Sequence, residues 1–276
     1  MSASEALAID IRPQSDMYAT YRRIAYKVWF AIGEFVDNST QNFFTHSADI
    51  EAAIGQPSSL TVDITYDSKA DTLTITDNAH GMNFDELVRA VRLNAPPDDK
   101  SGRSEFGMGL KMAACWLGKR WRIVTKRLGS DVEYSVLVDV DRLSQHRPDE
   151  IPVQEITGLD PAQHYTRIEI DGLYRKYRAN TVTKIIEHLS SIYRRDLKSG
   201  RITMLWNGAP LEWTDRPPFE MKLPDGGTRV LRMPVNFEVS GLPVKGYVWV
   251  SIPGAARYAG FHLFRRGRLV VGGPAE

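Results

Sequence analysis

Glu34 and Asn38 are the first two residues in this sequence whose types and spacing could do chemistry together. A four-residue spacing puts both side chains on one face of a helix. Glutamate is a common general base, and an amide oxygen is a suitable ligand for a hard cation such as magnesium. The pair predicts a magnesium-nucleotide site, although an isolated Glu-x-x-x-Asn is more often solvated surface.

Asp77 is the second candidate, because it directly follows a segment, 72–76, in which apolar and polar residues alternate. Small residues and Gly81-Met82 come next, and they allow a backbone to approach a ligand closely. A carboxylate at the end of a strand can accept a hydrogen bond from a base amino group. Taken alone, Asp77 is more often an ordinary residue at a strand-to-turn junction.

The third candidate is the segment 106–111, which contains Gly107 and Gly109 immediately before a predicted helix over 110–117. Glycines entering a helix N-terminus leave backbone amides and a partial positive charge for phosphate oxygens, and Lys111 would add a full charge. The preceding segment 94–105 is polar and interrupted by proline and glycine, which suits either a lid over a ligand or a plain surface loop.

The elements that must position these residues follow from hydrophobic periodicity. One helix is predicted from about Met17 into the forties, with a single apolar stripe. Strands are predicted over 60–66, 72–76, 121–126, 132–138 and 166–170, and a short helix begins at the capping box of Asn83 and Glu86. The members of the stripe are Tyr21, Ile24, Ala25, Val28, Ile32, Phe35 and Val36.

In this order and spacing, the three segments resemble the ATP-site motifs of the GHKL superfamily, which includes gyrase B, heat-shock chaperones, histidine kinases, MutL and MORC proteins. The resemblance covers about Met17 to Asp171. It implies an α+β fold: a Bergerat-type α/β sandwich that binds ATP, followed by a partial transducer-like α+β domain. The expected boundaries are 1–172 for the ATP-binding domain and 173–276 for the second, which is expected to be incomplete at its C-terminus.

The resemblance also implies a role for each matched residue. Glu34 would orient the hydrolytic water, Asn38 would hold magnesium, and Asp77 would bind the adenine amino group. The remaining cofactor-binding residues are Gly81, Met82, Gly107, Met108, Gly109, Leu110 and Thr166, with Lys111 assisting at the phosphates.

Three positions depart from the family's pattern. Ala79 replaces the first glycine of Asp-x-Gly-x-Gly, Gln41 stands where many members have aspartate, and Ser104 replaces a frequent glycine. Alanine tolerates most backbone angles except positive φ, so ATP binding is still expected while hydrolysis is less secure. A glutamate at the start of the first motif resembles the ATPase members and not the kinases.

After about Tyr177 the pattern changes to an amphipathic helix and then strands over 202–206, 230–239, 244–252 and 260–271. This order resembles the transducer domain, closest to the MORC-like version. Arg265, Arg266 and Arg268 are expected to face solvent, a dimer interface or a phosphate backbone. The family's transducer lysine would lie beyond Glu276, which predicts a fragment or a shortened member.

Composition excludes several classes of protein. Lys and Arg number 35 against 34 Asp and Glu, so the chain lacks a basic surface typical of general nucleic-acid binders. A single cysteine, Cys115, allows no internal disulfide and no cysteine metal cluster. No export signal or membrane-spanning run is evident, so the expected location is the cytoplasm. The six histidines are scattered, and none is spaced to share a metal with another.

The preferred hypothesis is an ATPase in which Mg-ATP drives lid closure and homodimerisation, forming a clamp that acts on nucleic acid. One alternative is a nucleotide-sensing interaction module with negligible turnover. Another is a chaperone-type ATPase with a protein client. Neither alternative involves a membrane.

Overall fold

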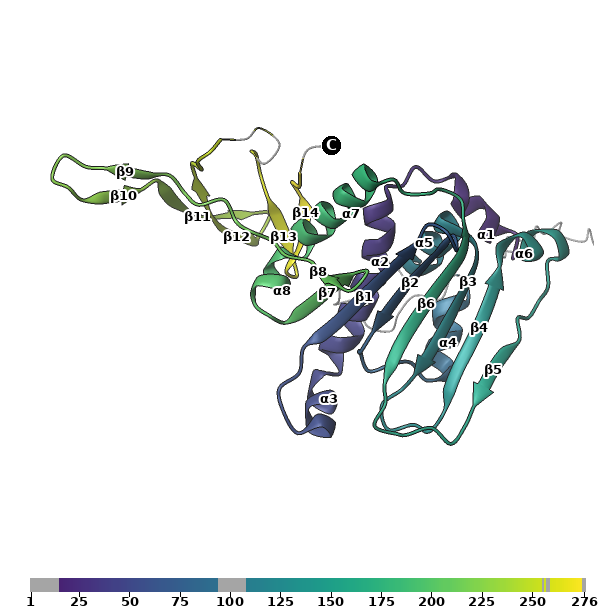
Figure 1. Ribbon diagram of the computed structural model, residues 1–276. Helices are drawn as coiled ribbons and strands as arrows, with labels where there is room; N and C mark the ends of the chain where they lie inside the picture. The colour runs from purple at the N-terminus through teal and green to yellow at the C-terminus, as the bar shows by residue number, and fades with distance from the viewer. Residues whose placement is uncertain (1–14, 94–107, 255, 257–258, 275–276) are drawn as a thin grey trace, which may run out of the picture.

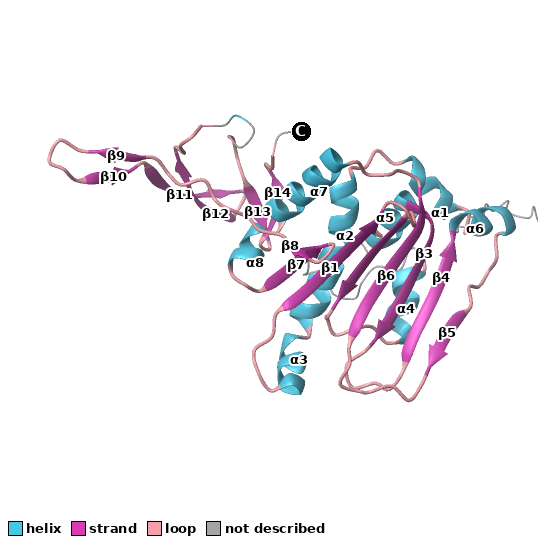
Figure 2. Cartoon of the chain, viewed as in Figure 1, coloured by secondary structure: helices cyan, strands magenta, loops and turns pink. Residues whose placement is uncertain are grey.

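The computed structural model describes residues 15–93, 108–254, 256 and 259–274. Figures 1 and 2 show helices grouped on one side of a large twisted sheet and a set of C-terminal strands that extends away from it. The segment 94–105, predicted to be a lid or a surface loop, lies outside the described residues, as do Ser104 and Gly107.

Eight strands form the main sheet, in the order β5-β4-β3-β6-β2-β1-β7-β8. Neighbouring strands are antiparallel, except that β1 and β7 are parallel. A mixed α+β fold with a largely antiparallel sheet confirms the predicted fold class. The strands are β1 (Leu60–Asp67), β2 (Thr72–Asp77), β3 (Gly118–Lys126), β4 (Glu133–Asp139), β5 (Val153–Ile156), β6 (Tyr165–Leu173), β7 (Ile202–Trp206) and β8 (Ala209–Pro210).

Helices α2 and α5 pack against each other on one face of this sheet (Figure 1). The capping box predicted at Asn83 and Glu86 is present at the start of α4. The helices are α1 (Met17–Thr20), the 3-10 helix η1 (Tyr21–Arg23), α2 (Val28–Thr45), α3 (Ser47–Ile54), α4 (Phe84–Val91), α5 (Gly109–Leu117), α6 (Val140–His146), α7 (Ala179–Ile192) and α8 (Arg194–Lys198).

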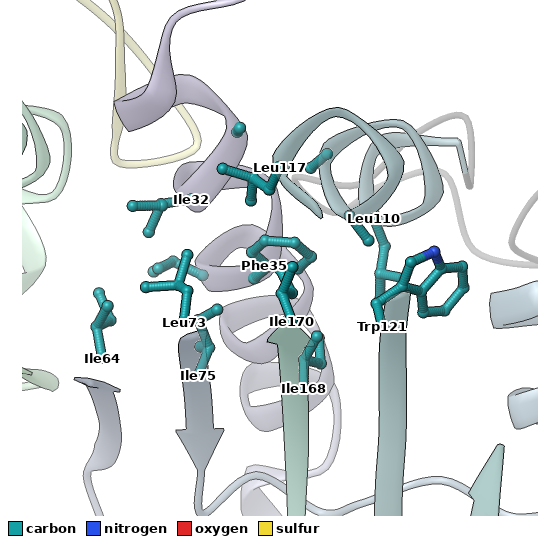
Figure 3. Close-up of a cluster of buried hydrophobic side chains, with 14 of the residues drawn as sticks. Ile32, Phe35, Ile64, Leu73, Ile75, Leu110, Leu117, Trp121, Ile168 and Ile170 are labelled. Carbon is teal, nitrogen blue, oxygen red and sulfur yellow. The ribbon is translucent and has the colours of Figure 1, made fainter. Parts of the chain in front are cut away.

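The core lies between α2, α5 and the sheet, and Figure 3 shows its centre. Phe35 of α2 is fully buried beside strand residues whose side chains alternate between the two faces of the sheet. Burial of large aliphatic and aromatic side chains is the main stabilising contribution, so α2 and α5 are held firmly in place. The labelled residues are Ile32, Phe35, Ile64, Leu73, Ile75, Leu110, Leu117, Trp121, Ile168 and Ile170.

The prediction of one helix from Met17 into the forties is wrong, because the chain is extended at Ile24 (φ −67°, ψ 137°) and α2 begins only at Val28. Ile24 is 41% exposed and is therefore not part of the apolar stripe. Its carbonyl instead accepts a hydrogen bond from Trp116 Nε1 of α5 at 3.0 Å. This tertiary contact uses a carbonyl that a continuous helix would need for its own backbone bond.

The C-terminal strands form three separate two-stranded ribbons. The single long strand predicted over 260–271 is wrong, because a turn at Arg266 and Gly267, both with positive φ, divides it into a hairpin. The strands are β9 (Glu220–Lys222), β10 (Thr228–Val230), β11 (Arg232–Val239), β12 (Leu242–Trp249), β13 (Leu263–Arg265) and β14 (Arg268–Val271).

Strands β7 and β8 follow residue 172 in the chain and yet pair with the main sheet through β1. Helix α7 also contacts α2. A domain boundary at 172/173 stays a prediction. Within the described residues, no helix is both long enough and apolar enough to cross a bilayer.

Candidate functional site

Helix α2 presents Glu34 and Asn38 on one partly exposed face, as their spacing predicts. Asn38 Nδ2 donates to the backbone carbonyl of Glu34 at 2.6 Å. Within the described part of the chain no hydrogen bond uses Asn38 Oδ1, so the amide offers the oxygen that a hard cation prefers. Tyr26, in the extended segment before α2, donates its hydroxyl to Glu34 Oε1 at 2.9 Å.

The N-terminus of α5 lies directly against Glu34. A β-carbon built on Gly109 would stand 1.9 Å from Glu34 Oε2, so a larger residue at this position would displace the Glu34 carboxylate. Met108, at the N-cap position, makes no side-chain hydrogen bond to the helix, and its side chain is partly exposed. The side chain of the N-cap residue therefore does not cap the first amides of α5, and a helix N-terminus of this kind can bind anions. The Leu110 side chain is buried in the core, so only its backbone takes part at this end.

Lys111 is fully buried, and its Nζ donates to the carbonyl of Arg89 in α4 at 3.0 Å. Burial lowers the pKa of Lys111 to about 8. In this arrangement the ammonium ties the C-terminal turn of α4 to α5. Its predicted role at the phosphates stays a prediction, and it would require the side chain to leave the Arg89 carbonyl.

Asp77 is buried at the end of β2 and is surrounded by donors. Ser39 of α2 donates its hydroxyl to Oδ2 at 2.5 Å, while the amides of Ala79 and Thr166 donate to Oδ1 at 3.0 and 3.3 Å. Burial raises the pKa of the Asp77 carboxyl above its ordinary value, although these hydrogen bonds oppose the shift. Ser39 follows Asn38 in sequence, so a single helix carries both the possible metal ligand and the residue that fixes Asp77.

Thr166 lies beside Asp77 through its backbone, and its hydroxyl is 3.1 Å from the hydroxyl of Thr125 on β3. Thr125 Oγ1 also accepts a hydrogen bond from the amide of Met82 at 2.9 Å. Gly81 has φ +78°, and a β-carbon there would stand 2.0 Å from the carbonyl oxygen of Lys126. The loop after Asp77 is thus packed backbone to backbone on β3, which requires glycine at this position.

Ala79 fits its position without strain, since it is not among the described residues with positive φ. Its side chain is buried, and its carbonyl accepts a hydrogen bond from His164 at 2.8 Å. The departure from glycine at this position therefore leaves the loop conformation intact.

Arg268 contradicts the expectation that it faces solvent, because its side chain is only 20% exposed and Nε lies 2.7 Å from Asp37 Oδ2. Tyr193 of the chain between α7 and α8 donates to the Gly33 carbonyl at 2.8 Å and to Asp37 Oδ1 at 3.0 Å. Although burial opposes its charge, the neighbouring Tyr193 and Asp37 raise the pKa of Arg268. This cluster joins β14 to the helix that carries Glu34.

Two of the histidines that are scattered in the sequence come together in the fold. His46, between α2 and α3, stacks on His80, with ring centroids 4.2 Å apart. The two residues are 34 positions apart in sequence and belong to different elements, so local spacing gave no signal for this pair.

The structure therefore brings the three predicted segments together: Ser39 contacts Asp77, and Glu34 contacts Gly109. Sequence reasoning missed Tyr26, Ser39 and Arg268. Only Ser39 had a signal in the sequence, because it directly follows the candidate metal ligand Asn38 and therefore lies next to the predicted site.

Comparison with known families gives one finding. The family described as "Histidine kinase-, DNA gyrase B-, and HSP90-like ATPase" matches residues 26–166, which is just over half of the chain. The match contains Glu34, Asn38, Asp77, Gly109 and Thr166. A search of curated proteins found no significant match.

Proposed function

Because the chain belongs to the family of histidine kinase-, DNA gyrase B- and HSP90-like ATPases, whose domain implies ATP binding, we propose that it binds Mg-ATP between α2, α5 and the loop after β2. We further propose slow hydrolysis of ATP to ADP and phosphate at this site. The observation that carries the proposal is that helix α2 brings two groups of site residues together, Ser39 with Asp77 and Thr166, and Glu34 with Gly109.

In this proposal Asp77 recognises adenine. A buried carboxylate that is held by three protein donors is pre-oriented, and an exocyclic amino group would be one more donor to it. The Thr125 and Thr166 hydroxyls are close enough to share a water or a ring nitrogen of the base. The backbone of Gly81 and Met82 would form the neighbouring side of the proposed adenine site.

The phosphates would lie at the N-terminus of α5, where the N-cap residue Met108 supplies no side-chain hydrogen bond. Asn38 fits a magnesium ion, because its Oδ1 remains available while Nδ2 holds the Glu34 carbonyl. Bound magnesium would neutralise phosphate charge and help position the nucleotide. Gly107 is assigned to the same phosphate site by resemblance alone.

Glu34 would act as the general base. Its carboxylate is fixed from one side by the Tyr26 hydroxyl and lies against the helix end that would receive the phosphates. A carboxylate in that position can orient a water and accept its proton as the water attacks the γ-phosphate.

The finer assignment is a MORC-like, nucleotide-driven homodimeric clamp acting on nucleic acid. What supports it is the order of the three motifs, followed by a helix and antiparallel ribbons. The Arg268–Asp37 ion pair gives such a clamp a physical link between the C-terminal ribbons and the catalytic helix.

A second candidate is a nucleotide-sensing module with negligible turnover. Lys111 favours it, because an ammonium bound to the Arg89 carbonyl supplies no charge to the phosphates. Without a full positive charge at the leaving phosphate, phosphoryl transfer is slower by orders of magnitude.

The test is a thermal shift titration with Mg-ATP of the wild type, Asp77→Ala and the exposed control Asp67→Ala. Loss of a hydrogen bond to a charged group should cost about 1.5–3 kcal/mol, which weakens binding by roughly 10–150-fold. The control should retain the wild-type shift. An undiminished shift in Asp77→Ala would refute the adenine assignment, and single-turnover hydrolysis by the wild type separates the two candidates.

A further inference from the structure

His46, Asp49 and His80 bring three potential metal-ligand atoms to within 4.8 Å of one another. His46 is the residue between α2 and α3, and Asp49 is in the first turn of α3. His80 belongs to the loop that begins with Asp77. Two segments distant in sequence therefore contribute to one cluster.

His80 is the central member of this cluster. Its side chain is 5% exposed, and its Nδ1 has no hydrogen-bond partner among the described residues. A buried ring nitrogen without a partner is costly, and a structure usually compensates for such an atom. Burial, followed by the nearby His46 and Arg127, lowers the pKa of His80 to about 4.

His46 and Asp49 complete the set. His46 Nδ1 lies 3.5 Å from Asp49 Oδ2, so the imidazole and the carboxylate are already close enough to approach one ion. Asn42, one turn before His46 on α2, donates to the Gly81 carbonyl at 3.2 Å, and its Oδ1 is buried without a partner in the described residues. Two buried polar atoms near the stacked rings, Asn42 Oδ1 and His80 Nδ1, thus lack partners within the described residues.

We propose that His46, Asp49 and His80 bind a divalent transition-metal ion of the zinc type, which fastens the Asp77 loop to the α2–α3 junction. Two imidazoles and a carboxylate are a donor set that such ions accept with a water in the fourth position. Ligand atoms on a tetrahedral zinc are about 3.3 Å apart, so the side chains must close by roughly 1.5 Å or less.

The stacked rings have nearly parallel planes, 16° apart, and their nitrogens do not converge as they stand. His46 must therefore turn out of the stack on binding. Its side chain is 25% exposed and lies at a junction between helices, where rotation meets little resistance, while the buried His80 stays fixed. The proposal does not depend on ATP binding, because no residue of the cluster is assigned to the nucleotide.

The experiment is a zinc titration of the untagged, nucleotide-free chain in competition with a chromophoric chelator. A second titration uses cobalt, whose visible absorption reports whether the ion occupies a low-symmetry site. The variants are His46→Ala and Asp49→Asn, both of partly or fully exposed residues. The matched controls are His146→Ala and Asp141→Asn, an exposed histidine and carboxylate of α6.

We expect one zinc per wild-type chain, a rise in melting temperature on binding, and at least a 10–100-fold loss of affinity in His46→Ala, since changes even outside the ligand set cause losses of about that size. Asp49→Asn should also weaken binding, and the controls should not. Absence of zinc binding to the wild type, or equal affinity in His46→Ala and His146→Ala, would overturn the proposal and leave the pair as ring stacking only.

Discussion

Alternate side chains of β1 and β2 are buried beneath helices, whereas no side chain of β11 or β12 is buried. Residues of the main sheet are thus held in place by packing against residues that are near in sequence and against residues that are distant. A two-stranded ribbon has no core of its own and is marginally stable in isolation. Glu34 and Asp77, whose proposed roles need fixed geometry, accordingly lie on the main sheet and on a helix packed against it.

The two regions meet at β14, which contacts α7 and α8. Leu269 is 6% exposed, and its neighbour Arg268 reaches Asp37. In their burial, residues 268 and 269 therefore resemble the main sheet more than they resemble the rest of the C-terminal ribbons. We therefore expect large effects from substitutions in the main sheet and the helices packed on it, an intermediate effect from a substitution at Arg268, and small effects from substitutions elsewhere in the ribbons.

The largest expected effect is on turnover. Glu34→Gln keeps the shape and hydrogen-bonding capacity of the side chain but cannot accept a proton from water, so hydrolysis should fall by about 10²–10⁴-fold. ATP binding should persist. Steady-state ATPase assays and a parallel binding titration measure both quantities, and loss of affinity would instead make Glu34 a binding residue.

A pair of leucines tests the comparison through stability. Leu73 is fully buried in β2, so Leu73→Ala should lower the free energy of unfolding by about 2–5 kcal/mol. Leu242 is 69% exposed in β12, and Leu242→Ala should change it by no more than about 0.5 kcal/mol. Urea unfolding provides both values. A large loss in the free energy of unfolding of Leu242→Ala would show that another molecule or segment covers this ribbon in solution.

Arg268→Ala should give an intermediate effect, because it leaves the buried Asp37 carboxylate without its cation. The expected loss is about 1–3 kcal/mol in the free energy of unfolding. Arg229→Ala, a change of an exposed arginine in the β9–β10 ribbon, is the control and should stay within about 0.5 kcal/mol. Equal effects of the two changes would mean that β14 is not coupled to α2.

The smallest effects concern pH, and two carboxylates of one hairpin should respond with opposite signs. Burial raises the pKa of Asp77, so its contribution to stability is present below about pH 3.8 and is lost as pH rises. Backbone hydrogen bonds from Ala70 and Lys69 lower the pKa of the exposed Asp67, so its contribution is lost as pH falls.

The measurement is unfolding at several pH values for wild type, Asp77→Asn and Asp67→Asn, without nucleotide. Relative to wild type, Asp77→Asn should gain stability as pH rises, and Asp67→Asn should lose it. The same sign for both variants would contradict the assigned environments.

The strands around the site were predictable because each has a local pattern. Alternation located β1 and β2, and the glycine at 118 located the end of α5. The break before α2 was not predictable, since the apolar period continues through Ile24 and only the distant Trp116 reveals why the helix stops. Arg268 and His46 were missed for a similar reason: each partner comes from another element, and no periodicity encodes such a contact.

The break before α2 also places Tyr26 within reach of Glu34. In an unbroken helix, eight residues would separate the two α-carbons by about 12 Å along the axis, yet the phenol oxygen lies 2.9 Å from the carboxylate. The four linker residues 24–27 thus determine how the Glu34 carboxylate is restrained. Evolution can change how tightly the Glu34 side chain is held by changing the linker residues, with every signature motif left unchanged.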